Sequence, residues 1–127
     1  MKKATLSFWV ILVLISLTAC TGMSISFQKY DEISDYVLKN KDTVLRQKEI
    51  EFFDYETTGL SIGGVYYGYY YTANNDIVVP DFYMDDNLGE QYEDDGGTYF
   101  GKPNSSKDWC FIKQITDKWY YYELHWG

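Results

Sequence analysis

The chain has 127 residues and a formal net charge of −8, and aromatic residues make up 20% of it. This length suits one small domain with a single core. The strong acidity argues against nucleic acid and anionic lipid as partners and favours a basic protein or a cation, although plain solubility would explain the same charge.

The first twenty residues predict an export signal. Lys2 and Lys3 precede an apolar run of about a dozen residues, which is too short to span a bilayer because a span needs about 20 apolar residues. The run ends in Leu17-Thr18-Ala19-Cys20, which resembles the lipobox of bacterial lipoproteins. An ordinary secretory signal with a chance cysteine is the alternative.

The lipobox resemblance implies that residues 1–19 are a lipoprotein signal peptide and that Cys20 is acylated. Residues 20–27 are then a lipidated tether, and residues 28–127 are a single domain. The residue after the cysteine is Thr21 and not an aspartate. The resemblance then implies transport to the outer membrane of the bacterial envelope, with the domain facing the periplasm. Loss of Lys2 and Lys3 would change the net charge from −8 to −10.

The pattern of the remaining chain predicts an α+β fold. Apolar residues at helical spacing between Phe27 and Gln47 indicate a helix, interrupted at 40–42 so that a second short turn is an alternative. An alternating pattern then indicates strands. The expected strands are 49–55, 60–72, 77–79, 98–102, 108–115 and 118–126, with turns at 56–59, 73–76 and 116–117. We expect the N-terminal helix to pack on an antiparallel meander of about five to six strands.

A tyrosine-rich strand is the first candidate binding feature. Side chains alternate between the faces of a strand, so Tyr67, Tyr69 and Tyr71 should share one face and Tyr66 and Tyr70 the other. One helix cannot cover both faces, so we expect at least one accessible row that could bind a protein or stack on sugars. Packing of both rows in the core is the alternative.

An acidic loop between residues 81 and 97 is the second candidate. Its density of carboxylates would attract a basic partner or a cation. The expected partner-binding residues are Asp85, Asp86, Glu90, Glu93, Asp94 and Asp95. The spacing fails as an EF-hand because Gly96 stands where the closing glutamate belongs, so we assign no metal site; an irregular calcium site and a mobile, solvated loop are the alternatives.

The last hairpin is the third feature. A turn at 116–117 would pair Cys110 with Glu123 and place His125 diagonally, which resembles a nucleophile with its base. Trp109 would then face Leu124, and Phe111 would face Tyr122, as an apolar row. We favour a packing role for Cys110, because the single histidine lies next to the C-terminus and no glycine-rich oxyanion turn accompanies it. With Cys20 acylated, Cys110 would also have no partner for a disulfide.

The chain contains no nucleotide-binding loop, CxxC pair, HExxH zinc helix or serine elbow, so we expect a binding protein without cofactor rather than an enzyme. The segments Gly63 to Tyr71 and Trp119-Tyr120-Tyr121-Tyr122-Glu123, together with the lipobox, size and acidity, resemble the small immunity lipoproteins of contact-dependent, Rhs and type VI toxin systems. The resemblance implies a stoichiometric inhibitor of a toxin that acts in or through the envelope. A periplasmic lysozyme inhibitor and a structural or glycan-binding envelope lipoprotein are the alternatives.

Overall fold

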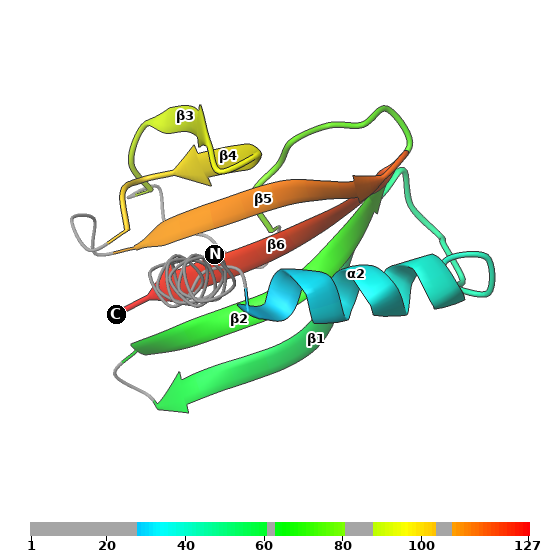
Figure 1. Ribbon diagram of the computed structural model, residues 1–127, viewed down its shortest axis with the longest axis horizontal. Coiled ribbons are helices and arrows are strands. Elements are labelled where there is room, and N and C mark those ends of the chain that lie inside the picture. The colour runs from blue at the N-terminus through cyan, green and yellow to red at the C-terminus, as the bar shows by residue number, and fades with distance from the viewer. Residues whose placement is uncertain (1–27, 61–62, 81–87, 104–107) are drawn as a thin grey trace, which may run out of the picture.

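The structure, a computed structural model, describes residues 28–60, 63–80, 88–103 and 108–127, which form one helix and six strands (Figure 1). The proposed signal peptide, Cys20 and the tether lie outside these residues. The elements are α2 (Gln28–Asn40), β1 (Ile50–Leu60), β2 (Gly63–Thr72), β3 (Gln91–Asp94), β4 (Gly97–Phe100), β5 (Trp109–Thr116) and β6 (Trp119–Trp126). The protein is therefore α+β, with the helix packed on an antiparallel sheet, as the sequence predicts.

The six strands form one sheet in the order β1-β2-β6-β5-β4-β3, and every neighbouring pair is antiparallel. The four strands from β3 to β6 follow one another as a meander, and β6 completes the sheet by pairing with β2. The chain between β2, which is next to the edge strand β1, and β3 must therefore pass to the opposite edge of the sheet. This crossing brings the acidic region of the sequence to the edge opposite β1.

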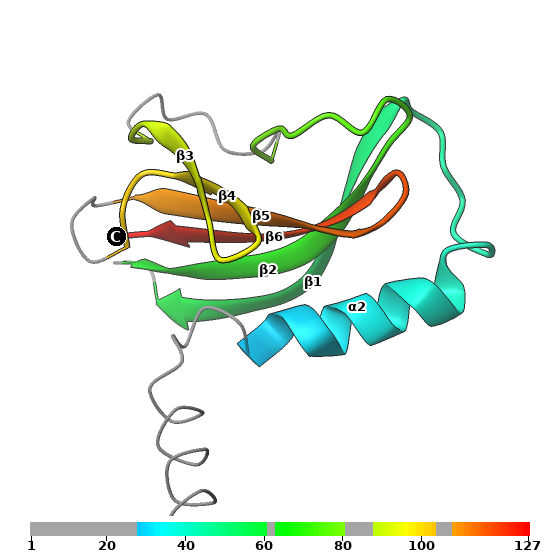
Figure 2. The ribbon, with the colours of Figure 1, turned by 45° about the horizontal axis from the view of Figure 1, so that its top comes forward.

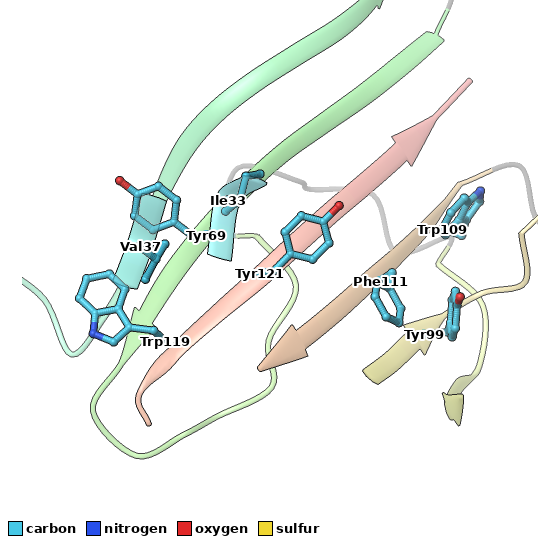
Figure 3. Close-up of a cluster of buried hydrophobic side chains, with 8 residues drawn as sticks. All are labelled: Ile33, Val37, Tyr69, Tyr99, Trp109, Phe111, Trp119 and Tyr121. Atoms are coloured by element: carbon cyan, nitrogen blue, oxygen red, sulfur yellow. The ribbon is translucent and has the colours of Figure 1, made fainter. Parts of the chain in front are cut away.

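Helix α2 covers one face of the sheet, here called the helix face. Ile33 and Val37, one turn apart on α2, are buried against aromatic side chains of the strands (Figure 3). The Tyr30 hydroxyl adds a polar contact by donating a hydrogen bond to the Gln114 carbonyl at 2.8 Å. The buried residues of this core are Ile33, Val37, Tyr69, Tyr99, Trp109, Phe111, Trp119 and Tyr121.

The other face, here called the loop face, carries a second core that part of the β2–β3 connection covers. Figure 2 shows α2 on one side of the sheet and this connection on the other. The buried Tyr70 hydroxyl donates to the Asp76 carbonyl at 2.8 Å and accepts from the Val78 N–H at 3.3 Å, which ties the connection to the sheet. The buried residues of this core are Tyr70, Cys110, Ile112, Tyr120, Tyr122 and Leu124.

The helix ends at the interruption that the apolar pattern shows at 40–42, and a turn follows it, which is the second of the two alternatives that the pattern allows. Asn40 closes it, because its side-chain amide donates to the Tyr36 carbonyl at 2.8 Å and its own carbonyl accepts from the Thr43 N–H and hydroxyl at 2.9 Å. Val44 still packs against the core from the following segment. The apolar stripe therefore continues beyond the end of the helix into the following turn.

Three predictions about the strands and turns are wrong. The turn predicted at 56–59 is the second half of β1, where a bulge between Asp54 and Glu56 lets the strand continue to pair with β2. Residues 77–79 are not a strand but part of the covering connection, where the Val78 N–H bonds to a tyrosine hydroxyl. Strand β3 was not predicted, because its residues were assigned to the polar loop.

The predicted register of the last hairpin is wrong by one residue. The turn lies at Asp117 and Lys118, and an irregularity between Gln114 and Thr116 shifts the pairing again, so that Cys110 faces Leu124. A slip of one residue moves every side chain of a strand to the opposite face relative to its partner. The predicted apolar row of Trp109 with Leu124 is therefore divided between the helix face and the loop face.

Candidate binding surface at the acidic hairpin

Strands β3 and β4 form a tight hairpin, here called the acidic hairpin, at one edge of the sheet. Asp94 pairs with Gly97, which leaves Asp95 and Gly96 as a two-residue loop with φ of 55° and 74°. Two successive residues with positive φ make the turn whose twist matches that of paired strands, and Asp-Gly is one of its preferred sequences. This dipeptide was the signal in the sequence that could have located the hairpin.

Four exposed carboxylates lie on the acidic hairpin or directly before it. Glu90, Glu93, Asp94 and Asp95 are exposed, and none forms an ion pair with a residue that the structure describes. Asp95 accepts a hydrogen bond from the Tyr99 hydroxyl at 2.7 Å, and burial together with this carboxylate raises the pKa of Tyr99. The structure therefore brings together four of the six acidic residues predicted to bind a partner; Asp85 and Asp86 lie outside the described residues.

A pocket of about 490 Å³ lies beside the acidic hairpin on the loop face. The Tyr120 hydroxyl at its wall donates to the Asn75 carbonyl at 3.2 Å, and the Gln114 amide donates to the Asn75 Oδ1 at 3.3 Å. Carboxylates next to an apolar wall suit a lysine or arginine side chain, whose hydrocarbon stem packs while its charged end is paired. The lining residues are Ile77, Glu93, Asp94, Gly96, Gly97, Thr98, Ile112, Gln114 and Tyr120.

The three tyrosines predicted to bind a partner lie on the helix face. Tyr69 is only 6% exposed, and burial next to Tyr36 raises its pKa to about 12. Tyr67 and Tyr71 are half-buried, and the Arg46 guanidinium stacks over the Tyr71 ring at 4.7 Å. Tyr69 and Tyr70 are thus core residues on opposite faces, and the structure does not join the tyrosines to the acidic pocket in one surface.

Cys110, Glu123 and His125 do not form a catalytic arrangement. Cys110 is fully buried in the core of the loop face, and burial raises the pKa of its thiol. Glu123 pairs with Phe111 and with Tyr67, both of which belong to the core of the helix face. His125 Nε2 contacts the Glu123 carboxylate at 2.7 Å and its ring stacks on Trp109. Cysteine and histidine therefore lie on different sides of the sheet.

Within the part of the chain that the structure describes, no three histidine, cysteine, aspartate or glutamate side chains converge as metal ligands. No helix among these residues is both long and apolar enough to cross a membrane.

The described residues define a small α+β domain in which one helix packs on an antiparallel sheet that carries an acidic pocket at one edge. No protein-family model, no curated protein and no solved structure matches this chain.

Proposed function

We propose that this chain is a lipid-anchored envelope protein that binds a basic protein through the acidic hairpin, and that its partner is a toxin, which makes it an immunity protein. The observation that carries the proposal is the set of four exposed carboxylates without described ion-pair partners beside an open pocket. Exposed charges of one sign accelerate the encounter with a partner of opposite charge. The lipobox resemblance at Cys20 supports the envelope location, where such a toxin acts or enters.

The pocket supplies the contacts that would make binding of the partner specific. Ile77 and Ile112 supply apolar contact, while Glu93 and Asp94 lie on the same pocket wall. A basic side chain inserted here would lose water on its stem and pair its charge, and buried anchors of this kind dominate the energy of protein interfaces. The partner would therefore present a protruding lysine or arginine to the acidic hairpin.

The test is capture by the full chain, held in detergent, of proteins from the envelope and secreted fractions of the source bacterium, followed by mass spectrometry and association kinetics. Glu93→Lys/Asp94→Lys is expected to slow association by about tenfold or more at low salt and to weaken its salt dependence. Asp35→Lys/Glu49→Lys is the matched control, because both residues are exposed, the charge change is the same and neither lines the pocket.

The identity of the captured protein and its rate of association distinguish three outcomes. Capture of a toxin domain that the hairpin variant binds slowly supports the proposal. Capture of a lysozyme would show that the partner is a lysozyme instead of a toxin, bound at the same surface. Equal association of the partner with wild type and hairpin variant would show that the acidic hairpin is not the docking surface.

A further inference from the structure

The end of α2 and the segment that follows it, residues 38–48 and here called the basic segment, differ in charge from the rest of the chain. Four of the eleven lysine and arginine residues of the chain lie in these eleven positions, against a single acidic residue, Asp42. Two leucines lie among them with unusual exposure: Leu38 is 49% exposed and Leu45 is 82% exposed. Cationic side chains interspersed with exposed leucines are typical of a surface that lies at the boundary of a lipid bilayer.

The positive charges of the basic segment are largely available. Lys39 and Lys48 are exposed and form no ion pair with any residue that the structure describes, whereas Lys41 lies 3.6 Å from Asp42. Arg46 is exposed while its guanidinium stacks over the Tyr71 ring, so the sheet orients it without neutralising it. Cation–π stacking leaves the guanidinium donors able to bind phosphate oxygens.

The basic segment and the acidic hairpin lie at opposite ends of the molecule. The basic segment leads into β1, which is one edge of the sheet, and the acidic hairpin contains β3, which is the other edge. Figures 1 and 2 both show the connection from α2 to β1 on the side away from β3 and β4. Arg46 of the basic segment reaches over Tyr71 of β2 and Trp119 of β6, so three strand spacings, about 14 Å, separate it from β3, which is still more than the Debye length of about 8 Å at physiological salt.

The net charge of the chain predicts that it avoids anionic lipid, and this separation changes that prediction. The acidity of the whole chain argues against an anionic membrane, but screening over such a distance lets the basic segment act as a local cation. We propose that the basic segment docks on anionic phospholipid headgroups, with Leu45 and Leu38 inserted at the interface. The sheet is then oriented with the acidic hairpin away from the bilayer. This docking does not depend on which protein the acidic hairpin binds.

The test compares hydrogen exchange of the full chain in nanodiscs of phosphatidylcholine alone and in nanodiscs that also contain phosphatidylglycerol. Only disc-bound chains are analysed, after purification through the scaffold protein. Amides of residues 38–48 are expected to exchange about tenfold more slowly on the anionic discs, since each basic residue near such a surface shifts partitioning about fivefold. Lys39→Gln/Lys48→Gln should abolish most of this protection, and Leu45→Ser should reduce it.

Lys102→Gln/Lys113→Gln is the matched control, because it removes the same charge from positions away from the basic segment and should keep the protection. Equal exchange of residues 38–48 on both kinds of disc would overturn the proposal, as would equal losses in the two double variants. Soluble poly-glutamate added to the phosphatidylcholine discs provides a further arm. Protection by poly-glutamate without protection by phosphatidylglycerol would assign the basic segment to an acidic protein and overturn lipid docking.

Discussion

His125 Nε2 lies 2.7 Å from Oε2 of Glu123, whose side chain is completely buried in the sheet. Among the described residues, the second carboxylate oxygen, Oε1, has no hydrogen-bond partner with good geometry, although the hydroxyl of the buried Tyr121 lies close to the carboxylate and opposes part of the rise in its pKa. Burial raises the pKa of Glu123, and the hydrogen bond from His125 opposes part of this rise. Burying a carboxylate that lacks part of its hydrogen bonds in an aromatic core costs free energy. The Glu123–His125 pair should therefore affect the free energy of unfolding.

Replacing the carboxylate should change how stability depends on pH. Because the pKa of Glu123 is raised in the folded state, folding favours its protonated form, and the free energy of unfolding should fall as pH rises through that pKa. Glu123→Gln removes this contribution. Relative to the variant, the wild type should therefore gain stability as pH is lowered from about pH 8 to about pH 5, measured by urea denaturation at each pH. The same stability difference at every pH would show that Glu123 does not titrate differently on folding.

Removing the contact of α2 with the sheet should destabilise the domain strongly. Ile33 is fully buried, and Ile33→Ala removes apolar contact and leaves a cavity that costs about 2–5 kcal/mol in the free energy of unfolding. Leu45→Ala is the control, because a side chain that is 82% exposed should cost less than about 0.5 kcal/mol. Urea denaturation measures both variants. Similar losses in the two would contradict the packing of α2 on the sheet.

Removing the single hydroxyl oxygen of Tyr70 should loosen the connecting segment on the loop face. Tyr70→Phe removes the hydroxyl that bonds to the Asp76 carbonyl and the Val78 N–H, which should cost about 1–3 kcal/mol because two backbone groups lose their partner. Hydrogen exchange of residues 76–80 should accelerate more than that of β6. Tyr71→Phe, at a half-buried position on the other face, is the control and should leave exchange in 76–80 unchanged.

A methyl group at Gly68 should be incompatible with the sheet. A Cβ there would collide with the Phe53 carbonyl oxygen and the Tyr122 ring, both held by paired strands. Gly68→Ala should therefore cost about 3 kcal/mol or more, or prevent folding, as overpacking of a rigid core does. Gly127→Ala, where nothing lies within 4 Å, is expected to be neutral. Circular dichroism and urea denaturation of both variants are the measurement, and an equal effect would contradict the close approach of β1, β2 and β6.

The elements predicted best are those in which sequence pattern and burial agree. The spacing of Ile33 and Val37 identified the helix, and both are buried against the sheet. The alternation in β2 assigned Tyr67, Tyr69 and Tyr71 to one face and Tyr66 and Tyr70 to the other, as the two cores show. Periodicity is a local property, so the sequence is sufficient for it.

The predictions that failed depended on pairing between distant segments. The one-residue error in the last hairpin arose because the loop at Asp117–Lys118 and the irregularity before Thr116 determine the register, and alternation alone cannot distinguish neighbouring registers. The prediction of an accessible tyrosine row fails at Tyr69, which packs against α2 in the core of the helix face, and a connecting segment covers Tyr70 on the other face.

The sequence by itself determined the fold class, the strand faces and the acidity, because each follows from local pattern and composition. It also carries the lipobox resemblance at Cys20, which no described residue bears on. Only the tertiary structure decided that β3 lies at the far edge of the sheet, that Glu93 and Asp94 line a pocket there, and that the basic segment lies at the other end. The physical reason is that strand order sets which charges meet, and strand order depends on contacts between residues far apart in the chain.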